Sequence, residues 1–263
     1  MMTRVQLFDW SWNEPTFYWS LLAIWVALGA ASFVALLLTP APYGRFARSG
    51  WGPRLNPKLG WILMEGPAAV VFFLFFVASG RTDPMSIVFL LLWLTHYVYR
   101  GYVYPLRRRG GSGVPLFVVL SAFAFNVTNG YLQSRYLFHF APPYPVRWSA
   151  GPWFLVGIAL FAAGWLAVVW TDNALRQLRG RDDGQGYTIP QGGLFRWVSC
   201  PNYLGEIIEW TGWALLTLSP AGAAFAFWTV ANLLPRALAH QRWYRTHFAD
   251  YPPDRKALIP YLL

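Results

Sequence analysis

The chain has 263 residues, of which 56% are hydrophobic, 19% aromatic and only 12% charged. Soluble domains carry roughly 25% charged residues, so this composition excludes an ordinary water-soluble domain and predicts a protein built for lipid. A single cysteine, Cys200, excludes an internal disulfide and a cysteine-based metal cluster, and the four histidines show no metal-ligand spacing. We therefore predict no metal site.

Apolar stretches recur along the chain, and most are long enough to cross a bilayer, which takes about 20 residues. They lie at residues 16–38, 61–79, 85–104, 114–138, 151–171, 203–219 and 222–235. The last two are short, so the boundary between them is the least sharply defined. The sequence thus predicts an all-α integral membrane protein of seven transmembrane helices, forming a single membrane domain over residues 1–263.

The basic residues predict the orientation of these helices. With the N-terminus outside, the inner loops and the C-terminal tail hold most of them: Arg45, Arg48, Arg54, Lys58, Arg107, Arg108, Arg109, Arg176, Arg179, Arg181, Arg196, Arg236, Arg242, Arg245, Arg255 and Lys256. Lys and Arg are enriched in cytoplasmic loops, which predicts an outer N-terminus and a cytoplasmic C-terminus. The net charge of +10 then needs no nucleic-acid partner to explain it.

Three glutamates interrupt the apolar runs. Glu65 lies in the second predicted helix, and Glu206 and Glu209 lie in the sixth. Ionisable groups at membrane depth are costly and usually functional. Each could instead hold helices together by hydrogen bonds, which is the structural interpretation of a single buried carboxyl group.

Polar residues also recur at helical spacing, and residues three or four apart share a helix face. The stripes are Tyr97–Arg100–Tyr104, Asp172–Arg176–Arg179, Asn202–Glu206–Glu209 and Asn232–Arg236–His240–Tyr244. Snorkelling to headgroups explains the arginines equally well. Lipid cannot satisfy the last two stripes, so we expect them to face a cavity, each other, or a ligand that is anionic at one end.

The loop between the fifth and sixth predicted helices is rich in glycine and arginine, which suits it to phosphate. Pro201 marks a plausible helix start, and a helix N-terminus offers free N–H groups to an anion. The chain has neither a GxGxxG fingerprint nor a GxxxxGK[ST] loop. Any nucleotide would therefore bind among the membrane helices.

Long strings in the second half resemble the steroid 5α-reductase family. They include IPQGGLF, LGEIIEW and RKALIP, within a near-continuous match from Asp172 to Leu263. Shorter matches occur earlier in the same order, namely EGP at Glu65–Pro67, HYVYRGYVYPL at His96–Leu106 and NGYLQ at Asn129–Gln133.

The resemblance implies a seven-helix membrane reductase that uses NADPH to reduce the conjugated double bond of a 3-oxo-Δ4 steroid. Hydride goes to the β-carbon and a proton to the α-carbon. Glu65 and Tyr97 match the family's catalytic pair, and burial of Glu65 favours the protonated form that can donate a hydrogen bond. The matching cofactor-side positions are Asp172, Arg179, Tyr187, Asn202, Glu206, Arg236, His240 and Tyr244, and we expect Arg100 and Arg109 to bind the cofactor as well.

Charge and hydrogen-bonding capacity suggest which part of the cofactor each of these residues binds. Arg179 and Arg236 suit the diphosphate, because guanidinium–phosphate bonds are strong. Asn202 and Glu206 suit the carboxamide or the ribose, and Tyr187, His240 and Tyr244 suit phosphate or adenosine. We expect residues 1–140 mainly to form the substrate pocket and residues 141–263 mainly the NADPH site.

The chain departs from the family pattern at two positions and leaves one assignment open. Thr188 stands where an arginine is common, and Met64 replaces a glutamine beside Glu65. One residue of the cluster Arg107–Arg109 is expected to meet the 2′-phosphate and favour NADPH over NADH. A positive-inside anchor explains this cluster almost equally well.

Two further functions are compatible with the sequence. One is reduction of another enone or of an enoyl-thioester lipid. The other is the activity of an isoprenylcysteine-type membrane methyltransferase, but the IPQGGLF and LGEIIEW strings argue against it. The expected partners are a hydrophobic steroid or enone lipid and the surrounding membrane lipid, with no obligatory protein partner. The expected location is a bacterial inner membrane or the endoplasmic reticulum.

Overall fold

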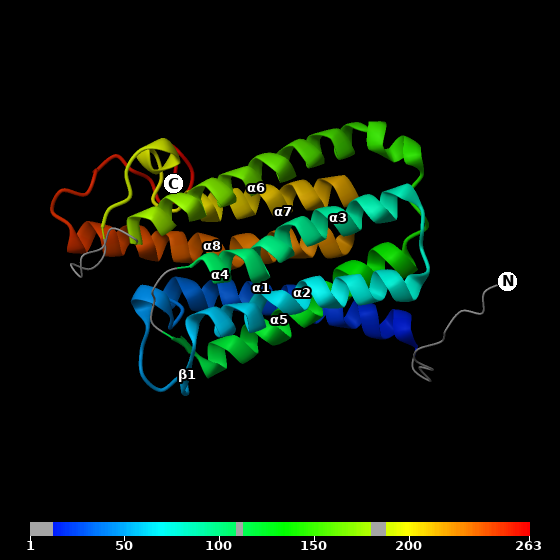
Figure 1. Cartoon of the computed structure of the whole chain (residues 1–263), viewed down its shortest axis with the longest axis horizontal. Coiled ribbons are helices and arrows are strands. Elements are labelled where there is room, and N and C mark those ends of the chain that lie inside the picture. Colours follow the sequence, from blue (N-terminus) through cyan, green and yellow to red (C-terminus); the bar gives the residue numbers. More distant parts are fainter. Residues whose placement is uncertain (1–12, 109–112, 180–187) are drawn as a thin grey trace.

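The computed structural model describes residues 13–108, 113–179 and 188–263. In these residues, seven helices of 15 residues or more lie along one common axis (Figure 1). They are α1 (Glu14–Leu38), α2 (Pro57–Ser79), α3 (Pro84–Val98), α5 (Leu116–Arg135), α6 (Pro152–Arg179), α7 (Pro201–Thr217) and α8 (Pro220–His247).

Short elements extend or connect these helices. The π-helical segment η2 (Tyr99–Val103) joins α3 to α4 (Tyr104–Arg107), and a second π-helical segment, η3 (Tyr136–Phe140), continues α5. Single 3-10 turns lie in the loops, at η1 (Gly44–Phe46), η4 (Val146–Ala150) and η5 (Gly193–Arg196). A two-residue antiparallel pair, β1 (Arg54–Leu55) with β2 (Val114–Pro115), ties the loop before α2 to the start of α5.

Each predicted apolar stretch corresponds to one long helix, so the number and order of the helices are confirmed. Two of the helices extend beyond their apolar stretches, as the polar stripes on them indicated: α6 continues past residue 171 to Arg179, and α8 past residue 235 to His247. Hydropathy detects only the lipid-facing length of a helix, whereas these two helices continue as polar turns beyond it.

Among the described residues, four helices are both long and apolar enough to cross a membrane: Glu14–Leu38, Pro57–Ser79, Leu116–Phe140 and Pro152–Leu178. The chain is therefore an all-helical membrane protein with a small β pair. Helices α3 and α7 have 15 and 17 residues and are shorter than a typical span of about 20. Seven crossings and the orientation of the termini remain predictions.

Four helix starts follow one local pattern, a capping residue followed closely by proline. The side chains of Asn56 and Asp83 accept hydrogen bonds from the backbone N–H groups of the first turns of α2 and α3, and Ser219 does the same for α8. Asn13 caps α1 in the same way. Such caps satisfy donors that a helix start leaves unpaired, and proline has no N–H to lose there. These signals define where each helix begins.

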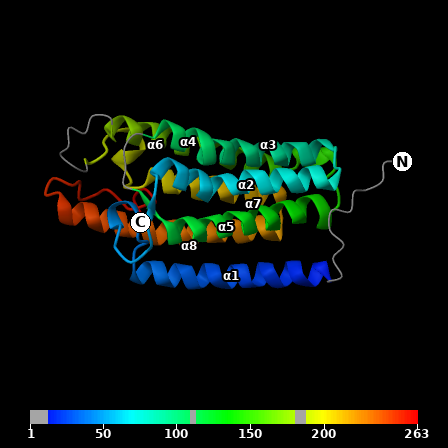
Figure 2. The same cartoon turned by 60° about the horizontal axis from the view of Figure 1, so that its bottom comes forward.

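Helix α1 lies at the edge of the bundle, next to α8 (Figure 2). The Trp228 indole donates a 2.7 Å hydrogen bond to the backbone carbonyl of Trp25, and the two rings lie 5.0 Å apart. Deeper in the bundle, aromatic side chains from α2, α3 and α7 form the core. Phe72 stacks on Trp93 at 4.6 Å, and Trp93 contacts Trp210 and Trp213.

Helices α6 and α7 approach each other closely along a seam of glycines. A Cβ atom at Gly164 would lie less than 3.0 Å from the backbone nitrogen of Glu209, and one at Gly212 would be equally close to that of Phe161. Small residues allow helix backbones to approach in this way within membranes. The seam fixes the position of α7 and of the glutamates that it carries.

We predict that Gly164→Ala destabilises the protein by about 1–3 kcal/mol, because the added methyl group overlaps the backbone of α7. Thermal unfolding in detergent should show a melting temperature lower by about 3 °C or more. The matched control is Ala163→Leu, since Ala163 is exposed on the adjacent face of the same helix. Equal stability of the Gly164→Ala variant and the unmodified protein would contradict the proposed role of the seam.

Candidate functional site

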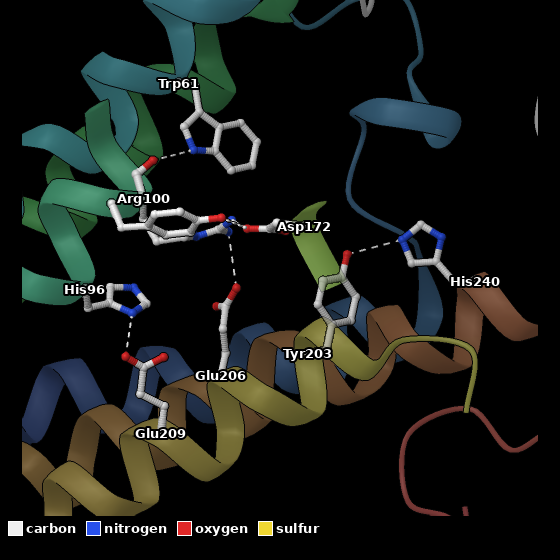
Figure 3. A network of polar contacts seen from close by, with 9 residues as sticks. Trp61, His96, Arg100, Asp172, Tyr203, Glu206, Glu209 and His240 are labelled. Atoms are coloured by element: carbon white, nitrogen blue, oxygen red, sulfur yellow. Dashed lines mark hydrogen bonds and ion pairs between the residues drawn. The ribbon is translucent and has the colours of Figure 1, made fainter. Parts of the chain in front are cut away.

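Arg100 links three helices at the centre of the polar network (Figure 3). Its guanidinium group, carried by the π-helical segment after α3, lies 3.4 Å from the Asp172 carboxylate on α6 and 3.1 Å from the Glu206 carboxylate on α7. The exposed fractions of the Arg100 and Glu206 side chains are 12% and 15%. The three predicted residues therefore meet in one place, and two of them keep part of their surface accessible.

Aromatic groups hold Arg100 in this position. The Trp61 indole donates a 3.0 Å hydrogen bond to the Arg100 backbone carbonyl, and the guanidinium lies 5.2 Å from the Trp61 ring and 5.1 Å from the Tyr104 ring. A π-helical turn widens the local backbone, and such turns are frequent at functional sites. Cation–π contact adds stabilisation to a guanidinium that is largely removed from water.

A second buried pair joins α3 to α7 one turn away. His96 Nδ1 lies 2.9 Å from a carboxylate oxygen of Glu209, which is fully buried (Figure 3). The His96 ring packs against Trp210 at 4.5 Å and against Tyr97 at 4.9 Å. Within the described parts of the chain, the other Glu209 oxygen has no hydrogen-bond partner. This pair makes Glu209 a bridge between helices, as well as a neighbour of Tyr97.

The two residues predicted to be catalytic lie close to this network. Tyr97 is buried, and its hydroxyl oxygen accepts a 3.3 Å hydrogen bond from the Asn129 side-chain amide. The Glu65 carboxyl interacts electrostatically with Arg100 and with Tyr97. The Asn126 amide donates a 2.7 Å hydrogen bond to the backbone carbonyl of the neighbouring Met64. Glu65 on α2 and Tyr97 on α3 thus lie within electrostatic reach of each other, and their catalytic role stays a prediction.

Arg236 and His240 lie on α8, facing the start of α7. The Arg236 guanidinium lies 4.5 Å from the Tyr43 ring and 5.3 Å from the Tyr203 ring, and none of the described carboxylates is within 4 Å of it. His240 Nε2 lies 3.3 Å from the Tyr203 hydroxyl. Its buried Nδ1 has no partner among the residues that the structure describes. These groups are arranged to receive a hydrogen-bonding or anionic ligand.

Two groups beside Arg236 lie outside the membrane-spanning segments and stay protonated. Burial raises the pKa of the Cys200 thiol to about 12, although the Arg45 and Arg236 charges act in the opposite direction. Burial likewise raises the pKa of the Tyr43 phenol. Neither group adds negative charge near Arg236 at neutral pH. The surroundings of this guanidinium therefore remain suited to an anion.

Asn202 and Tyr244 flank this part of the site. Asn202 lies in the first turn of α7, one turn before Glu206. The Tyr244 hydroxyl accepts a 3.1 Å hydrogen bond from Arg45, and its ring stacks on Tyr251 with 5.3 Å between centroids. Tyr244 therefore contacts the loop after α1 and the C-terminal segment, rather than the Arg100 network.

The C-terminal segment fastens the loop that precedes α7. Arg255 donates 3.0 Å hydrogen bonds to the carbonyl oxygen of Pro190 and to the side chain of Gln191. Lys256 forms a parallel bridge with Val198, adding backbone hydrogen bonds between the two segments. The IPQ part of the family string is thus held by the RKALIP part.

A pocket opens between α4 and α6 at the end of the bundle that carries the basic loops. Its lining is rich in arginine and tyrosine: Tyr99, Tyr104, Arg107, Arg108, Asp172, Asn173, Leu175 and Arg176. Two predicted cofactor residues, Arg109 and Tyr187, lie outside the described residues. For Arg179 only the backbone is described, at the end of α6.

Several members of the site were not predicted from the sequence. Trp61, Tyr43 and Tyr203 contact the two arginines through their rings, and an aromatic residue carries no distinguishing signal in a chain that is 19% aromatic. Asn129 had a usable signal, since it begins the NGYLQ string. Its partner lies on another helix, so local spacing could not assign it a role.

The fold and the site together define a helical membrane protein with a centre of acids, guanidiniums and a buried phenol between its helices. A model of the family described as 3-oxo-5-alpha-steroid 4-dehydrogenase matches residues 112–263. The chain is 41% identical to "Steroid 5-alpha-reductase DET2" of Gossypium hirsutum, over 95% of this chain and 98% of the relative.

Mammalian relatives are similarly close. "3-oxo-5-alpha-steroid 4-dehydrogenase 1" is 41% identical in Bos taurus, over 90% of this chain and 93% of the relative. The human protein of the same name is 40% identical, over 90% and 92%. The chain belongs to the steroid 5α-reductase family, which confirms the resemblance.

We predict that Arg100→Met destabilises the protein by about 3 kcal/mol or more, because it removes the positive charge between the Asp172 and Glu206 carboxylates. Thermal unfolding in detergent measures the effect. Arg147→Met, at an exposed arginine, should change the melting temperature little. If both variants unfold at the same temperature, the Arg100 network does not contribute to stability as described.

Proposed function

We propose that the chain catalyses NADPH-dependent reduction of the 4,5 double bond of 3-oxo-Δ4 steroids, giving 5α-dihydro products. Relatives at about 40% identity over most of the chain bear the names of this activity. The observation that carries the proposal is that the Glu65 carboxyl interacts electrostatically with both Tyr97 and Arg100, beside the Arg100 network. Such a pair suits a ketone oxygen on which negative charge develops.

In this proposal Tyr97 donates its hydroxyl hydrogen to the steroid ketone oxygen. Negative charge grows on that oxygen as the β-carbon is reduced, and a donor already in place stabilises it without reorganisation. Glu65 is the second hydrogen-bonding group on the same oxygen. Trp93 and Trp210 enclose the Tyr97 ring at 4.7 and 5.7 Å, which keeps water from competing for the donor. A proton then adds at the α-carbon.

The cofactor-side residues fit a nucleotide by their chemistry. Arg236 lacks a carboxylate within 4 Å among the described side chains, and the His240 Nδ1 atom is buried and unpartnered there. We assign Arg236 and Arg179 to the diphosphate, and Asn202 and Glu206 to the ribose or the carboxamide. His240, Tyr244 and Tyr187 are assigned to phosphate or adenosine. When bound, NADPH supplies the hydride.

The arginine-lined pocket supports a role for the basic cluster in choosing the cofactor. Arg107, Arg108 and Arg176 line it together with Asp172, so an anion there would meet several guanidiniums. A 2′-phosphate is such an anion, and its recognition would favour NADPH over NADH. The cluster also suits a positive-inside anchor, and both roles are compatible with its position.

We also propose that all seven long helices cross the membrane, with the N-terminus outside and the C-terminus in the cytoplasm. Helix α1 begins at the end of the bundle opposite to that where α8 ends, which supports an odd number of crossings (Figure 1). Helices α2 and α3 supply Glu65 and Tyr97, whereas α6, α7 and α8 supply most cofactor residues. This division supports a substrate pocket formed mainly by residues 1–140 and an NADPH site formed mainly by residues 141–263. The proposed location is a bacterial inner membrane or the endoplasmic reticulum.

The proposed function is tested by incubating purified protein in detergent with NADPH and testosterone. We expect the 5α-dihydro product to form, with one NADPH oxidised for each product molecule, as measured by the loss of NADPH absorbance. Turnover of an enoyl-thioester lipid without steroid turnover would keep the reductase chemistry and overturn the substrate. Thermal stabilisation by S-adenosylmethionine and not by NADPH would favour the methyltransferase instead.

We predict that Tyr97→Phe lowers kcat by about 100-fold or more, the usual loss when one donor to a developing oxyanion is removed. The control is Tyr18→Phe, at a similarly buried tyrosine whose hydroxyl donates to a backbone carbonyl on α5. Full activity of Tyr97→Phe would remove Tyr97 from the mechanism.

Glu65 is tested by comparing two substitutions. Glu65→Gln should retain more steroid turnover than Glu65→Ala, because glutamine keeps a hydrogen-bonding group of similar size. Turnover measured with saturating NADPH gives the comparison. Equal losses in both variants would mean that the ionised carboxylate is required.

A further inference from the structure

A chain of side-chain hydrogen bonds leads from α7 to the Tyr97 hydroxyl. Trp213 Nε1 donates to Gln133 Oε1 at 2.9 Å, and Gln133 Nε2 donates to the backbone carbonyl of Ala221 at 2.7 Å. Gln133 Nε2 also lies 3.4 Å from Asn129 Oδ1, and Asn129 Nδ2 lies 3.3 Å from the Tyr97 hydroxyl oxygen. The chain connects α3, α5, α7 and α8.

The chemistry of its ends fixes the direction of every bond in the chain. An indole N–H only donates and a backbone carbonyl only accepts, so Trp213 must meet the oxygen of Gln133 and Ala221 its nitrogen. The remaining N–H of Gln133 then meets the oxygen of Asn129. The Asn129 nitrogen is left to face Tyr97, and neither amide can be reversed without placing like groups together.

This direction determines what the Tyr97 hydroxyl can do. Its oxygen already accepts a hydrogen bond from Asn129, and no acceptor among the described residues receives its hydrogen. The hydrogen is therefore free for a ligand atom that accepts, such as a ketone oxygen. An acceptor at the Asn129 position would instead capture that hydrogen.

The two amides are enclosed, which makes the direction rigid. The exposed fractions are 0% for Asn129 and 1% for Gln133. An unsatisfied amide in such surroundings costs about 1–3 kcal/mol, so rotation of either side chain is strongly opposed. Bonds in a chain of this kind also strengthen one another.

We propose that Asn129 and Gln133 are positioning residues that orient the Tyr97 hydroxyl as a donor toward the substrate carbonyl. The inference rests on the proposed function, in which Tyr97 donates to a ketone. Asn129 and Gln133 are the first and last residues of the NGYLQ string, so this role accounts for both ends of the string. A Tyr97 hydroxyl held in this orientation favours ligands that present an acceptor atom to it.

The test is Asn129→Asp, which keeps the size of the side chain and replaces the donor with an acceptor when ionised. We expect kcat to fall about 100-fold at pH 8, as for loss of an oxyanion donor, with little change in KM. Activity should recover as the pH is lowered, because the introduced carboxyl group, once protonated, can donate to Tyr97 again. The unmodified protein should not show this recovery.

A double-mutant cycle separates positioning from a general structural effect. In the Tyr97→Phe background, Asn129→Asp should lower kcat less than about threefold, because no hydroxyl is left to orient. Asn129→Ala, which introduces no charge, is the second variant. On its own it should lower kcat by about 10-fold, and in the Tyr97→Phe background it should have a much smaller effect. Ser134→Ala is the matched control, since the hydroxyl of this buried serine of α5 donates to backbone carbonyls of its own helix.

Each outcome decides a separate question. Steroid turnover by the unmodified protein, together with full activity of both Asn129 variants, overturns the positioning role and leaves the proposed function intact. Losses that are as large in the Tyr97→Phe background as without it also overturn the positioning role. Absence of turnover by the unmodified protein overturns the proposed function and this inference with it.

Discussion

The structure depends on one buried ionic contact, the guanidinium of Arg100 between the carboxylates of Asp172 and Glu206. Charges removed from water in this way need partners, because an unpaired buried charge is strongly destabilising. The three residues come from the segment after α3, from α6 and from α7, so their pairing sets how these helices meet. The same contact places Arg100 near Glu65, which links the two halves of the proposed site.

Close packing makes that contact possible. The glycine seam brings α7 against α6, and the aromatic core of Phe72, Trp93 and Trp213 sets the distance from α7 to α2 and α3. Within this frame the polar groups occupy fixed positions, and the chemistry needs little further rearrangement. Rigid support of this kind is what keeps donors aimed at a reacting atom.

Much of the fold could be predicted from the sequence, because apolar length and capping residues are local signals. The stripes on α7 and α8 correctly indicated that Glu206 and Arg236 face inward. Contacts between helices could not be predicted in the same way. The pairing of His96 with Glu209 joins residues more than a hundred positions apart, and no local pattern specifies it. The π-helical turn after α3 was also missed, since hydropathy does not report a change of helical pitch.

That turn has a consequence for how the protein tolerates change. The segment Tyr99–Val103 closes i→i+5 hydrogen bonds, so it holds one more residue than an α-helical stretch that turns through about the same angle. Removing a single residue there would restore ordinary winding and leave α4 facing nearly the same way, because the wide turn already absorbs the extra residue. The change would be confined to the turn itself, where Arg100 and its backbone carbonyl, which the Trp61 indole binds, would lose their present positions. The length of this stretch is therefore as much a determinant of the site as its side chains.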